Sequence, residues 1–160
     1  MVKVTVAQAG EDEFGIDISR VVEILKVQRV YPLPHLPASL TGVINTRGYV
    51  IPILDLRRRF GIEPAPGKER IIIIRYGNEK VGLLVDGVKE IVSFESGEII
   101  PPPSIFKGMK TEYLTGIGKK NDRIIILLNL DTLLSSEEKI QIEEATKIIG
   151  ANDAETRTPS

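Results

Sequence analysis

Few of the 160 residues have side chains suited to covalent chemistry. The chain has no cysteine and one histidine, His35, which lies in the proline-rich segment "YPLPHLP" with no acidic neighbour close in sequence. The absence of cysteine excludes disulfides, thiolate nucleophiles and cysteine-ligated metals, and one histidine cannot form an ordinary zinc site. We therefore interpret His35 as a surface or packing residue and not as a general base.

Acidic pairs and phosphate-binding loops do not supply a catalytic site either. Asp12 and Glu13 fall in a predicted turn, and Glu137 and Glu138 fall in the first turn of a predicted helix. Solvation and the helix dipole account for carboxylates at such places. The chain has neither a glycine-rich loop before a lysine and a hydroxyl residue nor a GxGxxG motif. The sequence therefore predicts a protein without catalytic residues, metal or cofactor.

One basic run, "LRRRF" at Leu56 to Phe60, suggests a different activity. It is either a solvated turn or the contact surface of a small barrel that binds single-stranded nucleic acid. The net charge of −1 and the aromatic content of 5%, without tryptophan, argue against a nucleic-acid surface. The nucleic-acid function is kept as the alternative.

A further charged residue, Arg47, lies at the tip of a predicted turn in "TGVINTRGYVIPILDL". Apolar segments flank the turn on both sides. Arg47 is therefore part of an ordinary hairpin, of a ligand-binding loop or of a surface that contacts another protein.

The elements that must position these residues are mostly short strands, and they occur twice. "VTVAQAGEDEFGIDISRVVEIL" from Val4 aligns without a gap with "IIIIRYGNEKVGLLVDGVKEIV" from Ile71, at an offset of 67 residues (Gly15 to Gly82). "TGVINTRGYVIPILDL" aligns with "TGIGKKNDRIIILLNL" at an offset of 74 (Gly42 to Gly116). We expect the shared glycines to serve turns with positive φ. The repeat predicts two small antiparallel barrels that share a core, since each half alone is marginal in size.

The two ends of the chain differ from this pattern. Ser135 and Glu138 form a capping box, and apolar residues at helical spacing predict a helix over 135–150, followed by a frayed tail, 151–160. The N-terminus has no signal-peptide pattern, and no apolar run approaches the ~20 residues that span a bilayer. We therefore expect a soluble, cytoplasmic protein without direct membrane insertion.

The apolar segment around Glu23, from Val21 to Val27, allows two interpretations. It is a buried strand with one solvent-facing acid, or it lines an apolar groove with Glu23 at the rim, suited to a helix laid into it. The sequence does not decide between them.

Several of these motifs together resemble the CheW family of bacterial chemotaxis coupling proteins. They are "GIDISRVVEI", "LPHLPASLTGVINTRGYVIPILDLRRRFG", "VGLLVDGVKEIV", "PPP" and "TEYLTGIGKKNDRIIILLNLDTLLSSEE". The similarity runs in one order from about Val4 to Glu138, and GVIN-x-RG-x-x-x-P-x-x-DLR is its most specific part. Thr46 departs from the pattern, because an aliphatic residue is more usual at its position.

The resemblance implies a mainly β fold of two five-stranded antiparallel β-barrels on a shared apolar core, with a C-terminal helix. It implies a single CheW-like domain over 1–150, with halves 1–66 and 67–134 that can be interlaced. The implied function is a non-enzymatic adaptor that couples the cytoplasmic tips of methyl-accepting chemoreceptors to the histidine kinase CheA in signalling arrays. The implied receptor-binding residues are Val21, Glu23, Gly42, Arg47 and Ile91, and the implied kinase-binding residue is Val30.

Overall fold

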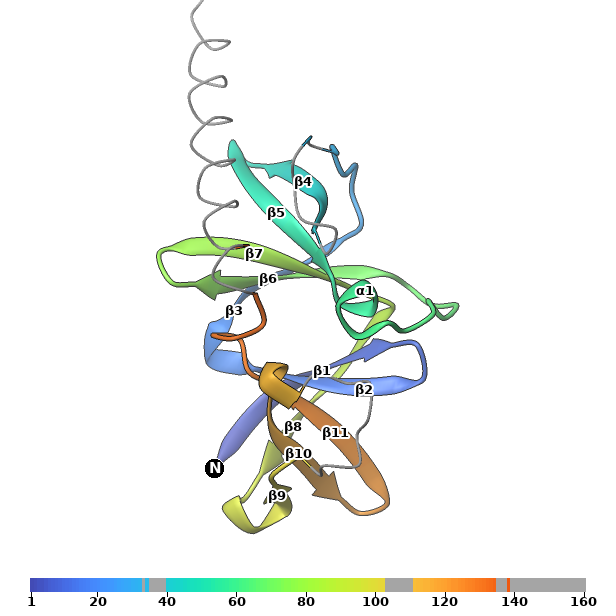
Figure 1. Ribbon diagram of the computed structural model, residues 1–160, viewed down its shortest axis with the longest axis vertical. Coiled ribbons are helices and arrows are strands. Elements are labelled where there is room, and N and C mark those ends of the chain that lie inside the picture. The colour runs from blue at the N-terminus through green and yellow to red at the C-terminus, as the bar shows by residue number, and fades with distance from the viewer. Residues whose placement is uncertain (33, 35–39, 103–110, 135–137, 139–160) are drawn as a thin grey trace, which may run out of the picture.

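The computed structural model describes residues 1–32, 34, 40–102, 111–134 and 138. These residues form eleven strands in two sheets, one short α-helix, α1 (Leu56–Phe60), and three 3-10 turns, η1 (Ile18–Arg20), η2 (Ser96–Glu98) and η3 (Thr111–Tyr113). Figure 1 shows the five-stranded sheet above the six-stranded sheet. His35, the predicted tail and the predicted C-terminal helix, apart from Glu138, lie outside the described residues.

The six-stranded sheet has the order β8-β1-β2-β11-β10-β9, made of β1 (Val2–Ala9), β2 (Asp12–Asp17), β8 (Gly87–Phe94), β9 (Ile99–Ile100), β10 (Leu114–Lys120) and β11 (Arg123–Leu128). The five-stranded sheet has the order β3-β6-β7-β5-β4, made of β3 (Val21–Lys26), β4 (Leu40–Thr46), β5 (Tyr49–Asp55), β6 (Arg70–Tyr76) and β7 (Glu79–Val85). Each sheet therefore takes strands from both halves of the chain.

The repeat is confirmed by the strand register. Pairs in the first half recur in the second at the offsets found in the sequence: Val4↔Asp17 as Ile71↔Leu84, and Gly42↔Ile53 as Gly116↔Leu127. The β4–β5 and β10–β11 hairpins also carry a register shift at equivalent places. The first hairpin of each half inserts between the third strand and the last hairpin of the other half.

This exchange of strands corrects the prediction of two five-stranded antiparallel barrels. The insertion places β2 beside β11 and β7 beside β5, and both of these pairs are parallel. One sheet has six strands, and within the described residues no ladder joins its edge strands β8 and β9, or the edge strands β3 and β4 of the other sheet. The sheets are therefore mixed and open, while the mainly β class and the shared core are confirmed.

The shared glycines have two different structural roles. Gly10 and Gly77 adopt φ values of 60° and 61° in equivalent hairpin turns, as expected from the sequence. Gly15 and Gly82 instead lie within strands, at the parallel pairs. A Cβ atom at Gly82 would lie 2.6 Å from Ile53 Cδ1, so glycine is needed there for close packing and not for a turn.

The run "IIII" from Ile71 to Ile74 explains how the core is divided. Ile72 and Ile74 join the large cluster that contains residues of both sheets, whereas Ile71 and Ile73 face a cluster within the curled five-stranded sheet. A third cluster, around Phe94, fills the six-stranded sheet. β6 is thus buried on both faces, which is why it reads as a continuous apolar run. Among the described residues, no helix is long and apolar enough to cross a membrane.

Candidate protein-binding site

Arg47 occupies the tip of the two-residue turn between β4 and β5. The turn is closed by the pair Thr46↔Tyr49, and Arg47 and Gly48 have φ values of 51° and 83°. Positive φ at both central residues is characteristic of the tight hairpin turn that suits twisted strands. The Arg47 side chain is 72% exposed, so this turn presents a charge to solvent.

Glu23 on β3 is the ion-pair partner of Arg47. β3 and β4 are the opposite edge strands of the five-stranded sheet, so the pair forms because the sheet curls and brings its edges together. The Glu23 side chain is 26% exposed and accepts a hydrogen bond from the Arg47 guanidinium. The structure therefore brings together two of the residues that the sequence selected, 24 positions apart in the chain.

Gly42, a predicted receptor-binding residue, lies next to Val30, the predicted kinase-binding residue. Gly42 is buried. Tyr31, next to Val30, makes two backbone hydrogen bonds with Val43, of 2.7 and 2.9 Å. A Cβ atom at Gly42, whose φ is 148°, would lie 2.3 Å from the Tyr31 carbonyl oxygen and 3.0 Å from Val30 Cγ1. Gly42 therefore lets the segment that contains Val30 lie close against β4.

The other two selected residues, Val21 and Ile91, lie on the edge strands β3 and β8. Val21 is half-buried against the large core cluster, whereas Ile91 is 55% exposed. Within the described residues, no hydrogen bond or ion pair joins either of them to the Arg47–Glu23 pair. Val21 and Ile91 thus lie at the edges of the two sheets, apart from the Arg47–Glu23 ion pair.

The second half of the chain has its own version of the Arg47–Glu23 pair. Glu90 is equivalent to Glu23 and pairs with Arg123, two residues beyond Asn121, which is equivalent to Arg47. Arg123 also binds Glu13 through two hydrogen bonds of 2.8 Å. These bonds with Arg123 outweigh burial and, with Lys89, lower the pKa of Glu13 to about 2. Arg123 of the second half thus binds two carboxylates in a local ion cluster, whereas Arg47 is largely exposed and pairs with Glu23.

A buried ion cluster, which sequence reasoning missed, joins the two sheets. Arg57 of α1 donates to Asp55 at 2.9 Å and to Asp86 at 2.7 Å, and all three side chains are at most 8% exposed. Asp86 also accepts from the backbone N–H groups of Gly10, at 2.6 Å, and Ala65, at 3.0 Å. The only local signal in the sequence is the Asp55-x-Arg57 spacing of a helix start, because Asp86 and Gly10 are distant from it.

The charge state of this cluster follows from its bonds. Burial alone would raise the pKa of Asp86, but the bonds from Gly10, Ala65 and Arg57 outweigh it and lower the pKa. The hydrogen bonds to Asp55 and Asp86 likewise raise the pKa of Arg57 above its ordinary value despite its burial. Arg57 and Asp86 are therefore both charged, and the cluster links the hairpin turn of one sheet to the helix and strand end of the other.

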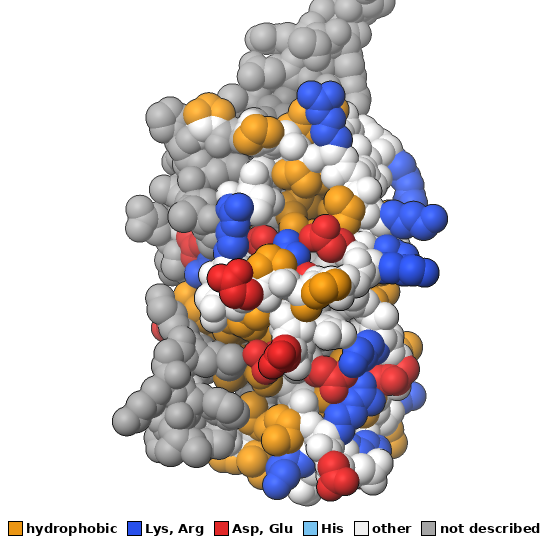
Figure 2. Space-filling model, turned by 90° about the vertical axis from the view of Figure 1, so that its right-hand side faces the viewer, with side chains coloured by type: hydrophobic (Ala, Val, Ile, Leu, Met, Phe, Trp, Pro, Cys, Tyr) orange, Lys and Arg blue, Asp and Glu red, His pale blue; other side chains and the backbone are white. Residues whose placement is uncertain are grey.

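The run "LRRRF" is neither a solvated turn nor a free basic surface. Arg57 is buried in the cluster above, and the Arg59 side chain, 9% exposed, binds Glu138 and the Tyr113 hydroxyl. Only Arg58 of the three points largely to solvent, at 62% exposure. Figure 2 shows acidic, basic and hydrophobic side chains interspersed over much of the described part of one face, with several basic side chains side by side at its right-hand edge.

No reaction centre is visible in the described part of the chain. Within it, no group of three or more histidine, cysteine, aspartate or glutamate side chains is placed to hold a metal ion. Its ionised groups with shifted pKa values are paired with opposite charges, as in the Asp86 and Glu13 clusters. The features that remain are an exposed charge pair and exposed apolar side chains at the sheet edges, which suit binding of another protein.

The chain is similar to known proteins. Residues 3–138 match the CheW-like domain family. The chain is 37% identical over 140 residues to the chemotaxis protein CheW of Klebsiella aerogenes, covering 86% of this chain and 84% of that protein. It is 34% identical over 137 residues to the chemotaxis protein CheW of Treponema pallidum, covering 82% and 81%.

A solved structure matches as well. The scaffolding protein TtCheW from Thermoanaerobacter tengcongensis superposes with a TM-score of 0.78 at 35% identity, over 86% of this chain and 90% of that one. The chain belongs to the CheW-like domain family.

Proposed function

We propose that this protein is a chemotaxis adaptor that couples methyl-accepting chemoreceptors to the histidine kinase CheA. The observation that carries this proposal is the match to chemotaxis CheW proteins over more than four fifths of both chains. The adaptor acts in the cytoplasm at membrane-associated receptor arrays, and it catalyses no reaction. Its effect comes from binding two partners at once, which raises the effective concentration of one near the other.

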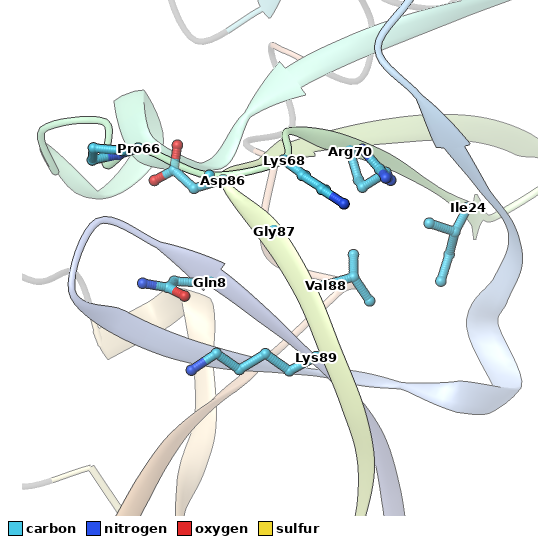
Figure 3. A pocket seen from close by; sticks show the side chains of 10 residues that line it. Gln8, Ile24, Pro66, Lys68, Arg70, Asp86, Gly87, Val88 and Lys89 are labelled. Carbon is cyan, nitrogen blue, oxygen red and sulfur yellow. The ribbon is translucent and has the colours of Figure 1, made fainter.

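The receptor-binding surface in this proposal contains Val21, Glu23, Arg47 and Ile91. The exposed Arg47–Glu23 pair supports it, since charged groups at the rim of an interface select the register of a helical partner. Ile91 supports it by its exposure. Ile24 of β3 and Val88 of β8 line one pocket (Figure 3). Their equivalents in the repeat are Ile91 of β8 and Val21 of β3, which form the corresponding pair. The pocket therefore supports a groove between β3 and β8. Gly42 contributes indirectly, by holding its neighbours in place.

The kinase-binding surface is assigned to the segment around Val30. This segment follows β3 and is attached to β4 through Tyr31 and Val43. Tyr31 is 43% exposed and Val27 is 47% exposed, so the segment presents apolar side chains. The two surfaces use different side chains.

The nucleic-acid alternative is not supported. Two of its three proposed contact arginines, Arg57 and Arg59, are bound to carboxylates within the protein. Relatives matched over most of their length are chemotaxis proteins.

A kinase-coupling assay tests the proposed function. Membranes containing a methyl-accepting receptor and purified CheA are incubated with labelled ATP, with and without this protein. We expect autophosphorylation of CheA to rise only when receptor, kinase and this protein are all present. No change in autophosphorylation, with the protein shown to be folded, would overturn the adaptor function.

A further inference from the structure

We infer that Tyr49 is a contact residue of the proposed receptor-binding surface and that Lys80 fixes its ring in place. Tyr49 is the first residue of β5 and directly follows the turn that carries Arg47. It is not among the residues that line the pocket between β3 and β8. The inference rests on the proposed adaptor function and adds to it a residue that sets partner specificity.

Tyr49 has an aromatic ring that the fold does not bury. At 62% exposure it is, after Met1, the most exposed of the large apolar side chains in the described residues. Ile51 and Ile53, which follow on the same face of β5, are almost completely buried within the five-stranded sheet. The apolar face of β5 therefore extends beyond the core and ends in a ring at the surface. Tyrosine is enriched among the residues that dominate the affinity of protein interfaces.

Lys80 on β7 holds the ring in one orientation. Its ammonium nitrogen lies 4.9 Å from the centre of the Tyr49 ring, within the roughly 6 Å range of a cation–π interaction. β5 and β7 are paired strands, so the backbone fixes both sides of this contact. Lys80 is exposed and forms no ion pair within the part of the chain that the structure describes. A ring that is already oriented loses less conformational entropy when a partner binds.

The other half of the chain indicates that the fold does not require this pair. The repeat offsets make Tyr49 equivalent to Arg123, and Lys80 equivalent to Glu13. Arg123 and Glu13 form an ion pair with two hydrogen bonds, and Arg123 also binds Glu90. The same strand arrangement is thus built with an ion cluster in one half and with an aromatic ring in the other. This asymmetry favours a binding role for the ring.

The tyrosine also accounts for the exposure of Arg47. Glu23 is equivalent to Glu90, but no cation occupies the position of Arg123 in its half, and Glu23 pairs with the turn arginine instead. Tyr49 therefore leaves Glu23 and Arg47 in a two-residue pair, for which a partner can compete. The first half presents a ring beside this separable ion pair, where the second half has a closed ion cluster.

The surface around Tyr49 fits an amphipathic helix with an acidic side chain one turn from an apolar one. Arg47 and Lys80 lie on either side of the ring in the sheet and supply positive charge, and Glu23 is already bound to Arg47. Glu79 is exposed, but it precedes Lys80 in β7 and so points to the opposite face of the strand. We expect the apolar side chain of the helix to contact the ring and its carboxylate to bind one of the cations.

Binding of a receptor-tip fragment to Tyr49 variants tests the inference. We expect Tyr49→Ala to weaken receptor binding at least roughly tenfold, and Tyr49→Phe to stay within about threefold, because the ring makes the contact. The control is Ile124→Ala, which removes a side chain that is 54% exposed on the equivalent hairpin of the other half. This control, and CheA binding by Tyr49→Ala, should stay within about twofold of the wild type.

A double-mutant cycle separates positioning by Lys80 from direct contact with the partner. Lys80→Gln should weaken receptor binding about threefold, whereas Lys80→Arg should retain it, because arginine also places a cation over the ring. In the Tyr49→Ala background, Lys80→Gln should change receptor binding by less than about 1.5-fold. An equal loss in both backgrounds would mean that Lys80 acts without the ring and would overturn its positioning role.

A fluorescent reporter follows the contact independently of the affinities. The chain has no tryptophan, so Tyr49→Trp places a single one at this position. With a receptor-tip fragment that lacks tryptophan, we expect the emission to shift to shorter wavelength as the indole ring leaves water. An unshifted emission in the formed complex would overturn the inference and leave the adaptor function intact. So would full receptor affinity of Tyr49→Ala with an unchanged circular dichroism spectrum. A folded wild-type protein that binds neither the receptor fragment nor CheA would instead overturn the adaptor function, and this inference with it.

Discussion

Arg47 and Glu23 form an ion pair that connects the tip of the β4–β5 turn to the opposite edge strand of the same sheet. The pair is on the surface, with the Arg47 side chain 72% exposed, and its counterpart in the other half, Glu90 with Arg123, is drawn into a larger ion cluster. Equivalent hairpins thus carry a largely exposed arginine in one half, Arg47, and a less exposed arginine within an ion cluster in the other, Arg123.

The Arg47–Glu23 pair should contribute little to stability. A double-mutant cycle with Arg47→Ala and Glu23→Ala should give a coupling free energy below about 1 kcal/mol, because exposed ion pairs are screened by water. Chemical denaturation of the four proteins measures it. A coupling above about 2 kcal/mol would mean that the pair holds the sheet edges together and is not primarily a recognition feature.

The buried Asp86 cluster should contribute much more. Asp86→Ala leaves the Gly10 and Ala65 N–H groups and part of Arg57 unpaired, so we expect the free energy of unfolding to fall by about 3–5 kcal/mol. Asp122→Ala, at an exposed position of a hairpin turn, serves as the control and should stay within about 0.5 kcal/mol. Similar losses for both variants in urea denaturation would contradict the role given to the cluster.

Gly42→Ala should detach the segment that contains Val30 and Tyr31. The added methyl group meets the Tyr31 carbonyl, and the φ of 148° is strained for alanine, so we expect a loss of about 1–3 kcal/mol. Faster exchange of the Tyr31 and Val43 amide protons is the specific readout. Gly97→Ala, where no atom lies within 4 Å, is the control. Unchanged exchange at Tyr31 in the Gly42 variant would contradict this account.

Stability should depend on the ionisation of Glu13. Its pKa is about 2 in the folded protein, below the ordinary value of 4.5, so the unfolded chain binds its proton first as the pH falls. The stabilisation by Glu13 is therefore complete above about pH 5 and is lost between about pH 4.5 and 2. We expect Glu13→Gln to reduce the unfolding free energy at pH 7 by about 1–2 kcal/mol, since its partners are partly exposed. The difference from wild type should shrink at pH 3, and an equal difference at both pH values would contradict it.

The sequence predicted the local pairing of the strands well. The offsets of 67 and 74 residues anticipated the shared register of the hairpins, and they aligned Arg47 with Asn121, which both adopt positive φ. Hairpin register depends on nearby residues and turn chemistry, so it can be inferred from a repeat. The mainly β class and the shared core followed from the same pattern.

The assembly of strands into sheets could not be inferred from the repeat alone. An exchanged arrangement and an unexchanged one bury the same apolar faces, so β2 could pair with a strand of either half. The parallel pairs β2–β11 and β5–β7 were therefore not predicted. The buried role of Arg57 was missed for a related reason, since Asp86 and Gly10, which complete its cluster, are distant in the sequence.

The most direct test of the adaptor account is the binding of Arg47→Glu to a receptor-tip fragment and to CheA, measured separately in pull-down titrations. The account predicts that receptor binding weakens at least roughly tenfold, because the reversed charge faces the partner at the interface rim, while CheA binding stays within about twofold. Lys119→Glu, on the equivalent hairpin of the other half, should change neither. Unchanged receptor binding by Arg47→Glu, with an unchanged circular dichroism spectrum, would contradict the account.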